Sequence, residues 1–184
     1  ALQCWGNPSS GHAAGRAARA IVDDARRAVL ALVDAERGAR LIFTSGATEA
    51  INQVISSAPA GRFITTALEH PAVLEAAARR SDLQVEFVEV EETGHVDALR
   101  VLEAVDAGDS PVLVCCMAAN NETGVVQPIG ELVRPLRDRE VPFLVDASQM
   151  AGRLTLNFEA PDYLVVTAHK LGGPKGVGAL IMRG

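Results

Sequence analysis

The chain has 184 residues, of which 48% are hydrophobic and 22% are charged, and its formal net charge is -6. This composition predicts a globular protein with a buried core and argues against a disordered chain. The acidic balance, together with the lack of a dense basic cluster, argues against nucleic acid as a partner.

The apolar runs and the cysteines indicate the cellular compartment in which we expect the protein. The longest uninterrupted apolar run, Val112 to Ala119, is far shorter than the roughly 20 residues needed to cross a bilayer, so we expect no membrane partner. Cys4, Cys115 and Cys116 form an odd set, and two of them are adjacent in an apolar run. This usage favours a reducing compartment, the cytoplasm, and predicts core thiols rather than catalytic ones.

A long amphipathic helix is predicted first, from about 11 to 33. Ile21, Ala25, Val29 and Leu32 recur there at helical spacing, with arginines and aspartates between them. We interpret the charged residues as a solvated helix face.

Short apolar runs and helix-length segments then alternate along the chain. The predicted strands are 41–44, 62–66, 85–90, 112–117, 142–146, 163–167 and 177–182, and the predicted helices between them are 47–57, 71–80, 96–107 and 129–139. Alternation of this kind predicts a three-layer α/β fold with a doubly wound, mainly parallel sheet. The last two strands are joined without a helix, which predicts one antiparallel strand, at an edge of the sheet.

Polar loops follow several of the predicted strands. In doubly wound sheets, ligands bind beyond the carboxyl ends of the strands. The turn 44–49 opens a helix whose free N–H groups can hold a phosphate, although a plain helix cap by Glu49 explains the same residues. His70 follows the second strand and Asn121 the fourth, and each has an ordinary structural interpretation as well.

Asp146 and Lys170 end the fifth and sixth predicted strands, so they can converge at one edge of the sheet. A buried carboxylate is costly without a cation, and a plain ion pair between the two residues is one explanation. The other is a Schiff base between Lys170 and pyridoxal 5'-phosphate, with Asp146 holding the pyridine nitrogen protonated.

Six ordered motifs decide between these interpretations. They are GNPSSGH, FTSGATEA, LEHPAV, NNETGVVQPI, VDASQ and AHKLGGPKGVGAL, and they extend over nearly the whole chain. Together they resemble the cysteine desulfurases, which belong to the class V aminotransferase-like, fold-type I pyridoxal phosphate enzymes.

The resemblance implies a role for each matching residue. Lys170 is implied as the lysine of the Schiff base, Asp146 as the partner of the pyridine nitrogen, and His70 as the residue that stacks on the ring and moves protons. Gln149 is implied near the ring hydroxyl, and Asn121 near that hydroxyl or the substrate carboxylate.

The phosphate ligands implied by the resemblance are Thr48, Thr167 and His169, and Ala47 belongs to the same cofactor-binding turn as Thr48. Lys175 is the rival lysine, but its flanking glycines indicate a turn. We expect no metal site.

The resemblance also implies what this chain does not contain. Residues 1–184 are expected to form the large, cofactor-binding domain, without the N-terminal segment and the small C-terminal domain of the family. That small domain supplies an arginine for the substrate carboxylate and the nucleophilic cysteine. None of the three cysteines matches the nucleophile position, and Cys4 is the only alternative within the chain.

The function implied is the removal of sulfur from L-cysteine to give alanine and an enzyme persulfide, for iron-sulfur cluster assembly or thiolation. Two alternatives keep the cofactor: a class V aminotransferase and a selenocysteine lyase. A third is a cofactor-binding or dimerisation fragment without turnover of its own. The expected partners are a sulfur-acceptor protein and a second copy of the chain in a homodimer, with an interface close to His70 and Lys170.

Overall fold

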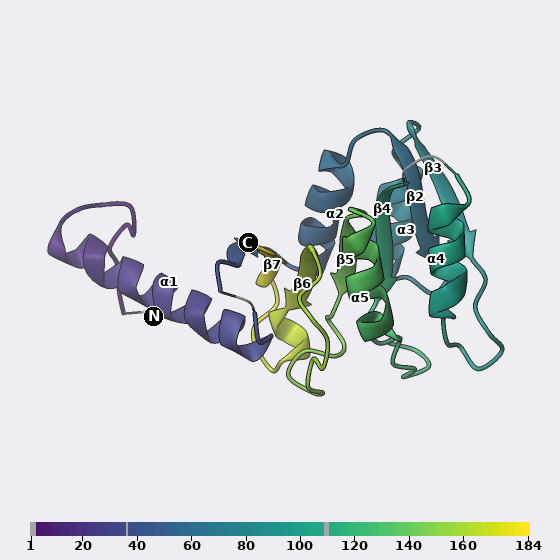
Figure 1. Ribbon diagram of the computed structural model, residues 1–184. Coiled ribbons are helices and arrows are strands. Elements are labelled where there is room, and N and C mark those ends of the chain that lie inside the picture. The colour runs from purple at the N-terminus through teal and green to yellow at the C-terminus, as the bar shows by residue number, and fades with distance from the viewer. Residues whose placement is uncertain (1–2, 36, 109–110) are drawn as a thin grey trace. The chain divides into compact units, whose positions relative to one another are not determined.

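The computed structural model describes residues 3–35, 37–108 and 111–184. These residues fall into two compact units, one within 1–35 and the other within 36–184. Figure 1 shows the long helix of the first unit and the helices and strands of the second.

The first unit is a helix preceded by a tight turn. The helix, α1 (Ala13–Leu32), confirms the predicted amphipathic helix, and His12 caps it by accepting the N–H of Gly15 at Nδ1 over 3.1 Å. The turn packs closely on the helix start, because a Cβ at Gly15 would lie 2.3 Å from the carbonyl oxygen of Ser10. Within the GNPSSGH motif, Gly6 has a similar structural reason, because a Cβ there would overlap the carbonyl oxygen of Ala14.

Seven strands form the single sheet of the second unit. They are β1 (Arg40–Thr44), β2 (Gly61–Thr66), β3 (Leu83–Val88), β4 (Pro111–Met117), β5 (Phe143–Asp146), β6 (Tyr163–Thr167) and β7 (Gly178–Met182). Each lies within two residues of a predicted strand at both ends. The continuous apolar runs predict buried strands, and most of β2, β5 and β6 is buried.

The strand order is β1-β7-β6-β5-β4-β2-β3. From β6 to β3 all neighbours are parallel, whereas β7 is antiparallel to both β6 and β1. The predicted single antiparallel strand is confirmed, but its predicted edge position is wrong. The short turn between β6 and β7 makes those two strands neighbours, and β1 then pairs with the other side of β7.

Four helices cover the two faces of the sheet. They are α2 (Ala47–Ser57), α3 (Pro71–Ala78), α4 (Ala98–Asp106) and α5 (Ile129–Asp138). The first two pack together on one face and the last two on the other, which confirms the three-layer α/β fold (Figure 1). Ile51 and Ile55 of α2 are fully buried against Phe63 and Leu144 of the sheet, where they form the centre of one core.

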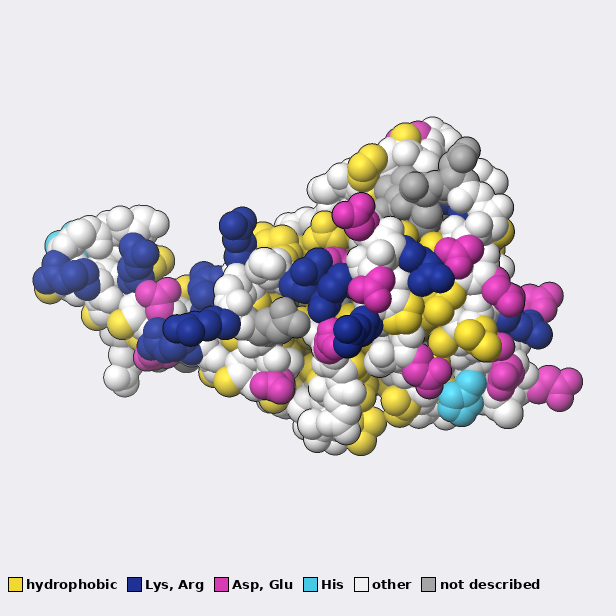
Figure 2. Space-filling view, viewed as in Figure 1, with side chains coloured by type: hydrophobic (Ala, Val, Ile, Leu, Met, Phe, Trp, Pro, Cys, Tyr) yellow, Lys and Arg dark blue, Asp and Glu magenta, His cyan; other side chains and the backbone are white. Residues whose placement is uncertain are grey.

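The face that carries α4 and α5 is charged. Figure 2 shows basic and acidic side chains interspersed there, without a large patch of one sign. Arg139, the C-cap residue of α5, donates to Asp106 of α4 over 2.8 Å and so joins the two helices. In the part of the chain that the structure describes, no helix combines the length and the apolar character needed to cross a membrane.

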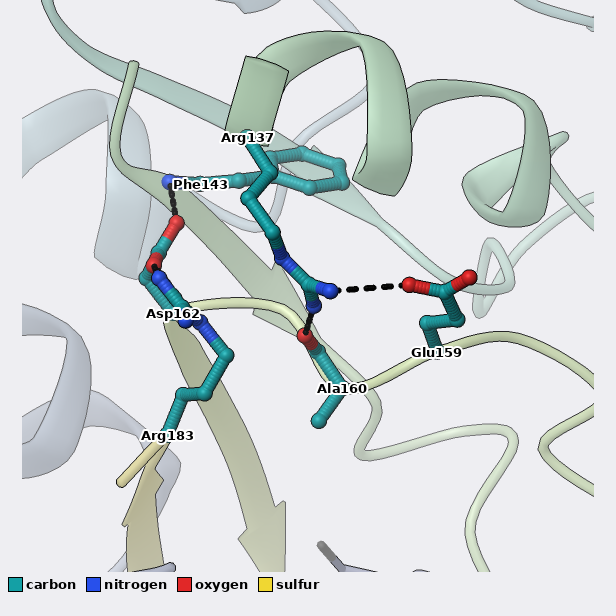
Figure 3. A network of polar contacts seen from close by, with 6 residues as sticks. All are labelled: Arg137, Phe143, Glu159, Ala160, Asp162 and Arg183. Atoms are coloured by element: carbon teal, nitrogen blue, oxygen red, sulfur yellow. Dashed lines mark hydrogen bonds and ion pairs between the residues drawn. The ribbon is translucent and has the colours of Figure 1, made fainter. Parts of the chain in front are cut away.

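At the amino ends of β5 and β6, a polar network holds the strands together (Figure 3). Asp162 accepts the N–H of Phe143 over 3.0 Å and the guanidinium of Arg183 over 2.7 Å. Arg137 reaches the same loop from α5 and donates to Glu159 over 2.8 Å. These contacts hold the amino ends of both strands in position. Because the two strands are short and paired, their carboxyl ends are held in register as well.

Candidate functional site

A cavity of about 400 Å³ opens at the carboxyl ends of the parallel strands. All of the predicted site residues line it: Ala47, Thr48, His70, Asn121, Asp146, Gln149, Thr167, His169 and Lys170. The topology explains the convergence, because β1, β2, β4, β5 and β6 all end at this edge. Lys175 also lines the cavity, since the antiparallel β7 begins where its neighbours end.

The amino terminus of α2 forms one wall. Gly46 is the N-cap residue and makes no side-chain cap hydrogen bond. It packs directly on β7, because a Cβ at Gly178 would lie 2.7 Å from the Cα of Gly46. Only glycine at 178 lets the helix start come so close to the sheet, and Ala47 and Thr48 of the first turn line the cavity.

Glu49 is the acidic residue in the first turn of α2. Its Oε2 accepts the N–H of Ser45 over 2.7 Å, and hydrogen bonds from Ser45 lower the pKa of this carboxyl group. The predicted helix cap by Glu49 is thus confirmed. It does not exclude a phosphate site, because Ala47 and Thr48 of the same turn line the cavity.

His70 begins α3 and lies at the cavity wall. Its Nδ1 accepts the N–H of Ala72 over 3.1 Å, so the ring caps the helix. This hydrogen bond requires Nδ1 without a proton, which leaves Nε2 available on the ring. The structural interpretation of His70 is therefore correct, and it is compatible with a role in the cavity.

Asp146 is 7% exposed and ends β5 at the cavity floor. Its Oδ1 accepts the N–H of Ser148 over 2.9 Å. Ser148 also lines the cavity, and its Oγ is buried without a hydrogen-bond partner. Buried polar groups normally have hydrogen-bond partners, so a buried carboxylate beside an unpaired hydroxyl indicates a binding site for a polar ligand.

Lys170 ends the 3-10 helix η1 (Ala168–Lys170) that directly follows β6. No ion pair joins it to Asp146 among the ion pairs of the described residues. The plain ion pair that explained both residues from the sequence is therefore not formed. Lys170 is half-buried and lines the cavity, whereas Lys175 is exposed in its glycine turn.

Two other predicted residues interact with neighbours at the cavity rim. The Oγ1 of Thr167 lies 3.1 Å from Nδ1 of His169, and the Thr167 side chain is buried while the imidazole is exposed. Gln149 is held by a hydrogen bond from Arg153. Neither contact is visible in the sequence, because both depend on the turns that follow β5 and β6.

Sequence reasoning missed Asn120, which shapes the loop after β4. Its Oδ1 accepts the N–H of Glu122 over 2.8 Å, and its Nδ2 donates to the carbonyl oxygen of Leu68 over 3.1 Å. The exposed Asn121 next to it lines the cavity. The double asparagine was the available signal, but only the fold separates the buried structural residue from the cavity residue.

The thiols of β4 do not belong to the cavity. Cys115 and Cys116 are buried, and burial raises the pKa of both thiols well above the usual value. A thiol in this state is a poor nucleophile, so the prediction of core cysteines is confirmed for these two residues.

With this geometry established, comparison with known proteins is informative. The family model described as aminotransferase class V matches residues 2–184. The chain belongs to the aminotransferase class V family. The class V enzymes similar to this chain depend on pyridoxal 5'-phosphate.

Curated members of the family share more than a third of their aligned residues with this chain. Cysteine desulfurase IscS of Neisseria meningitidis is 38% identical over 192 residues, which cover 98% of this chain and 47% of that protein. Putative cysteine desulfurase IscS 1 of Bacillus subtilis is 39% identical over 186 residues, which cover 96% of this chain and 48% of that protein. The chain thus spans about half the length of the curated relatives it matches.

Solved structures of class V proteins have the same fold. A NifS-like protein superposes with a TM-score of 0.88 at 35% identity, covering 98% of this chain and 52% of that chain. A structure described as SspA in complex with cysteine superposes with a TM-score of 0.86 at 29% identity, covering 97% of this chain and 53% of that chain.

The cavity suits the cofactor of the class V family in shape and chemistry. One end offers hydroxyl groups, an imidazole and the amino terminus of α2, which are ligands for a phosphate. The floor offers a buried carboxylate and the unpaired Oγ of Ser148, and the wall offers the amine of Lys170. These groups match a phosphate, a ring with polar substituents and an aldehyde.

Proposed function

We propose that the 184 residues form the cofactor-binding large domain of a pyridoxal phosphate-dependent cysteine desulfurase. The observation that carries the proposal is the convergence of Lys170, Asp146 and the start of α2 on one cavity. Membership of the class V family and the similarity to cysteine desulfurases over nearly the whole chain support it.

Different residues of the cavity are assigned to different parts of the cofactor. Thr48, Thr167 and His169, with the N–H groups of the first turn of α2, hold the phosphate. Asp146 would hold the pyridine nitrogen in its protonated form, because a buried carboxylate is most stable beside a positive charge. Gln149 and Asn121 lie at the rim for the ring hydroxyl or the substrate carboxylate.

The amine of Lys170 would hold the cofactor at its aldehyde group, and no acidic partner among the described residues occupies that amine. When bound, pyridoxal phosphate supplies an electron-withdrawing ring that stabilises negative charge on the substrate. Lys170 and Nε2 of His70 are the groups that can move protons on and off the substrate.

The substrate we propose is L-cysteine, which is named in the complex of one similar structure. The acceptor of its sulfur is then Cys4 or a thiol outside these residues, since the thiols of Cys115 and Cys116 are buried and do not line the cavity. A sulfur-acceptor protein for iron-sulfur cluster assembly or thiolation follows from this assignment. We also propose a homodimer, and a reducing compartment such as the cytoplasm, which fits three free cysteines.

Cofactor binding and substrate choice can be tested together. Purified protein mixed with pyridoxal phosphate is expected to gain a visible absorption band, which L-cysteine changes more than L-serine does. Lys170→Ala is expected to lose the band, and Lys175→Ala is the matched control that retains it. A wild-type protein without the band would contradict the cofactor assignment, and an equal response to both amino acids would contradict the assignment of L-cysteine.

A further inference from the structure

Glu69 is a buried carboxyl group that the proposed function does not use. It lies in the turn between β2 and α3, and only 4% of its surface is exposed. Its Oε1 accepts the N–H of Met117 over 2.8 Å, and its Oε2 lies 3.8 Å from Sγ of Cys115. A carboxyl group at this depth needs a reason, because burying it costs free energy.

The contacts of Glu69 join two parts of the cofactor site. The next residue in the chain is His70, which lines the cavity and caps α3. Met117, which donates its N–H to Glu69, is the register partner of Asp146 across β4 and β5. Glu69 therefore ties the turn that carries His70 to the strand end that lies beside Asp146.

Among the described residues, Glu69 forms no ion pair with a lysine or an arginine. The ionisable groups around it are Cys115 and Cys116 of β4, Asp146 of β5 and the adjacent His70. Burial, and to a smaller degree the charge of Asp146, raises the pKa of Glu69 to about 8. At neutral pH Glu69 is thus a neutral acid.

We propose that Glu69 is a positioning residue of the cofactor site, which anchors the His70 turn to the end of β4 beside Asp146. The inference rests on the proposed function, since it assigns Glu69 to the support of that site. Filling space in the core is not sufficient to explain the residue, because a hydrocarbon side chain would fill the same space without a desolvation cost.

Two near-isosteric variants separate anchoring from packing. Glu69→Gln keeps the volume and an acceptor for the N–H of Met117, whereas Glu69→Met keeps the volume and removes the acceptor. We expect pyridoxal phosphate to bind Glu69→Gln within about threefold of wild type, and Glu69→Met at least about tenfold more weakly, because the N–H of Met117 loses its partner. Glu75→Gln, an exposed carboxyl on α3 paired with Arg79, is the control and should bind like wild type.

Equal binding by Glu69→Met and wild type would overturn the inference. Absence of binding by wild type would instead contradict the proposed function, so the two failures are distinguishable.

A measurement on the cofactor-free protein covers the case in which Glu69→Met does not fold. The amide proton of Met117 donates directly to Glu69, so its chemical shift reports the charge of that carboxyl group. In wild type we expect this signal to titrate near pH 8, and in Glu69→Gln to stay constant. A signal that titrates equally in both proteins, or in neither, would show that Glu69 does not hold Met117 and would overturn the inference.

Discussion

The polar side chains at the two ends of strands β5 and β6 differ in whether they have interaction partners. At the amino ends, Asp162 binds the N–H of Phe143 and the guanidinium of Arg183, and both of its oxygens are used (Figure 3). At the carboxyl ends, Ser148 Oγ is buried without a partner, and Lys170 has no acidic partner among the described residues. Paired polar groups stabilise a fold, whereas unpaired ones cost stability and persist where they serve a ligand. The same strands thus separate a stabilising end from a binding end.

The largest effect that would sharpen this contrast is expected at Glu69. Its pKa is raised from 4.5 to about 8 in the folded state, so the unfolded chain releases this proton at lower pH than the folded one. The contribution of Glu69 to stability is therefore greatest below about pH 4.5 and falls as the pH rises to about 8. Over this window the loss is on the order of 4 kcal/mol, since each pKa unit corresponds to about 1.4 kcal/mol.

Glu69→Gln should remove this dependence. We expect the variant to match wild type near pH 4.5 and to become progressively more stable than wild type toward pH 8, as measured by urea unfolding at a series of pH values. Glu75→Gln is the control and should follow wild type. If the free energy of unfolding of Glu69→Gln and of wild type changed with pH in the same way, burial would not raise the pKa of Glu69.

A second test changes the charge at the binding end. Asp146→Asn keeps the size of the side chain and an acceptor for the N–H of Ser148, but it cannot neutralise a pyridinium. We expect the dissociation constant for pyridoxal phosphate to rise about 10- to 100-fold, which corresponds to a hydrogen bond to a charged group of about 1.5–3 kcal/mol. Titration of the visible band measures it. The urea midpoint of the cofactor-free protein should change little, and a variant that simply unfolds would indicate a structural role for Asp146.

The smallest effect is expected at the stabilising end. Asp162→Ala should lower the free energy of unfolding by about 1–3 kcal/mol, because the buried N–H of Phe143 loses its acceptor. Asp162→Asn retains an oxygen for that N–H and should recover part of the loss. Both variants should bind pyridoxal phosphate as wild type does. A large loss of cofactor affinity in Asp162→Asn would break the division between the two ends.

Most of the fold was predictable because the central strands are buried along most of their length and alternate with helices. Chain order and hydrophobicity located every strand, and the rule that ligands bind at carboxyl ends placed Asp146 and Lys170 together. The position of β7 was not predictable, since an antiparallel neighbour of β6 can lie at the edge or accept a further strand. Nothing in the sequence indicated that β1 would pair with it.

The buried polar groups were the part of the site that the sequence concealed. A glutamate before a histidine in a strand-to-helix turn is typical of an exposed loop, yet Glu69 is buried because the turn folds back on β4. Asn120 and Ser148 belong to quoted motifs, but their burial follows from tertiary packing and has no local signal. Residue identity indicated the ligands of the site, whereas three-dimensional packing determined the residues that support them.

We propose that Lys170 is the lysine that binds the cofactor. The most direct test is to add pyridoxal phosphate, reduce the protein with borohydride and locate the modified peptide by mass spectrometry. We expect one modified lysine, Lys170, because it is half-buried at the cavity wall and no acidic partner among the described residues holds it. Modification of Lys175 in its place, or no modified lysine, would contradict it.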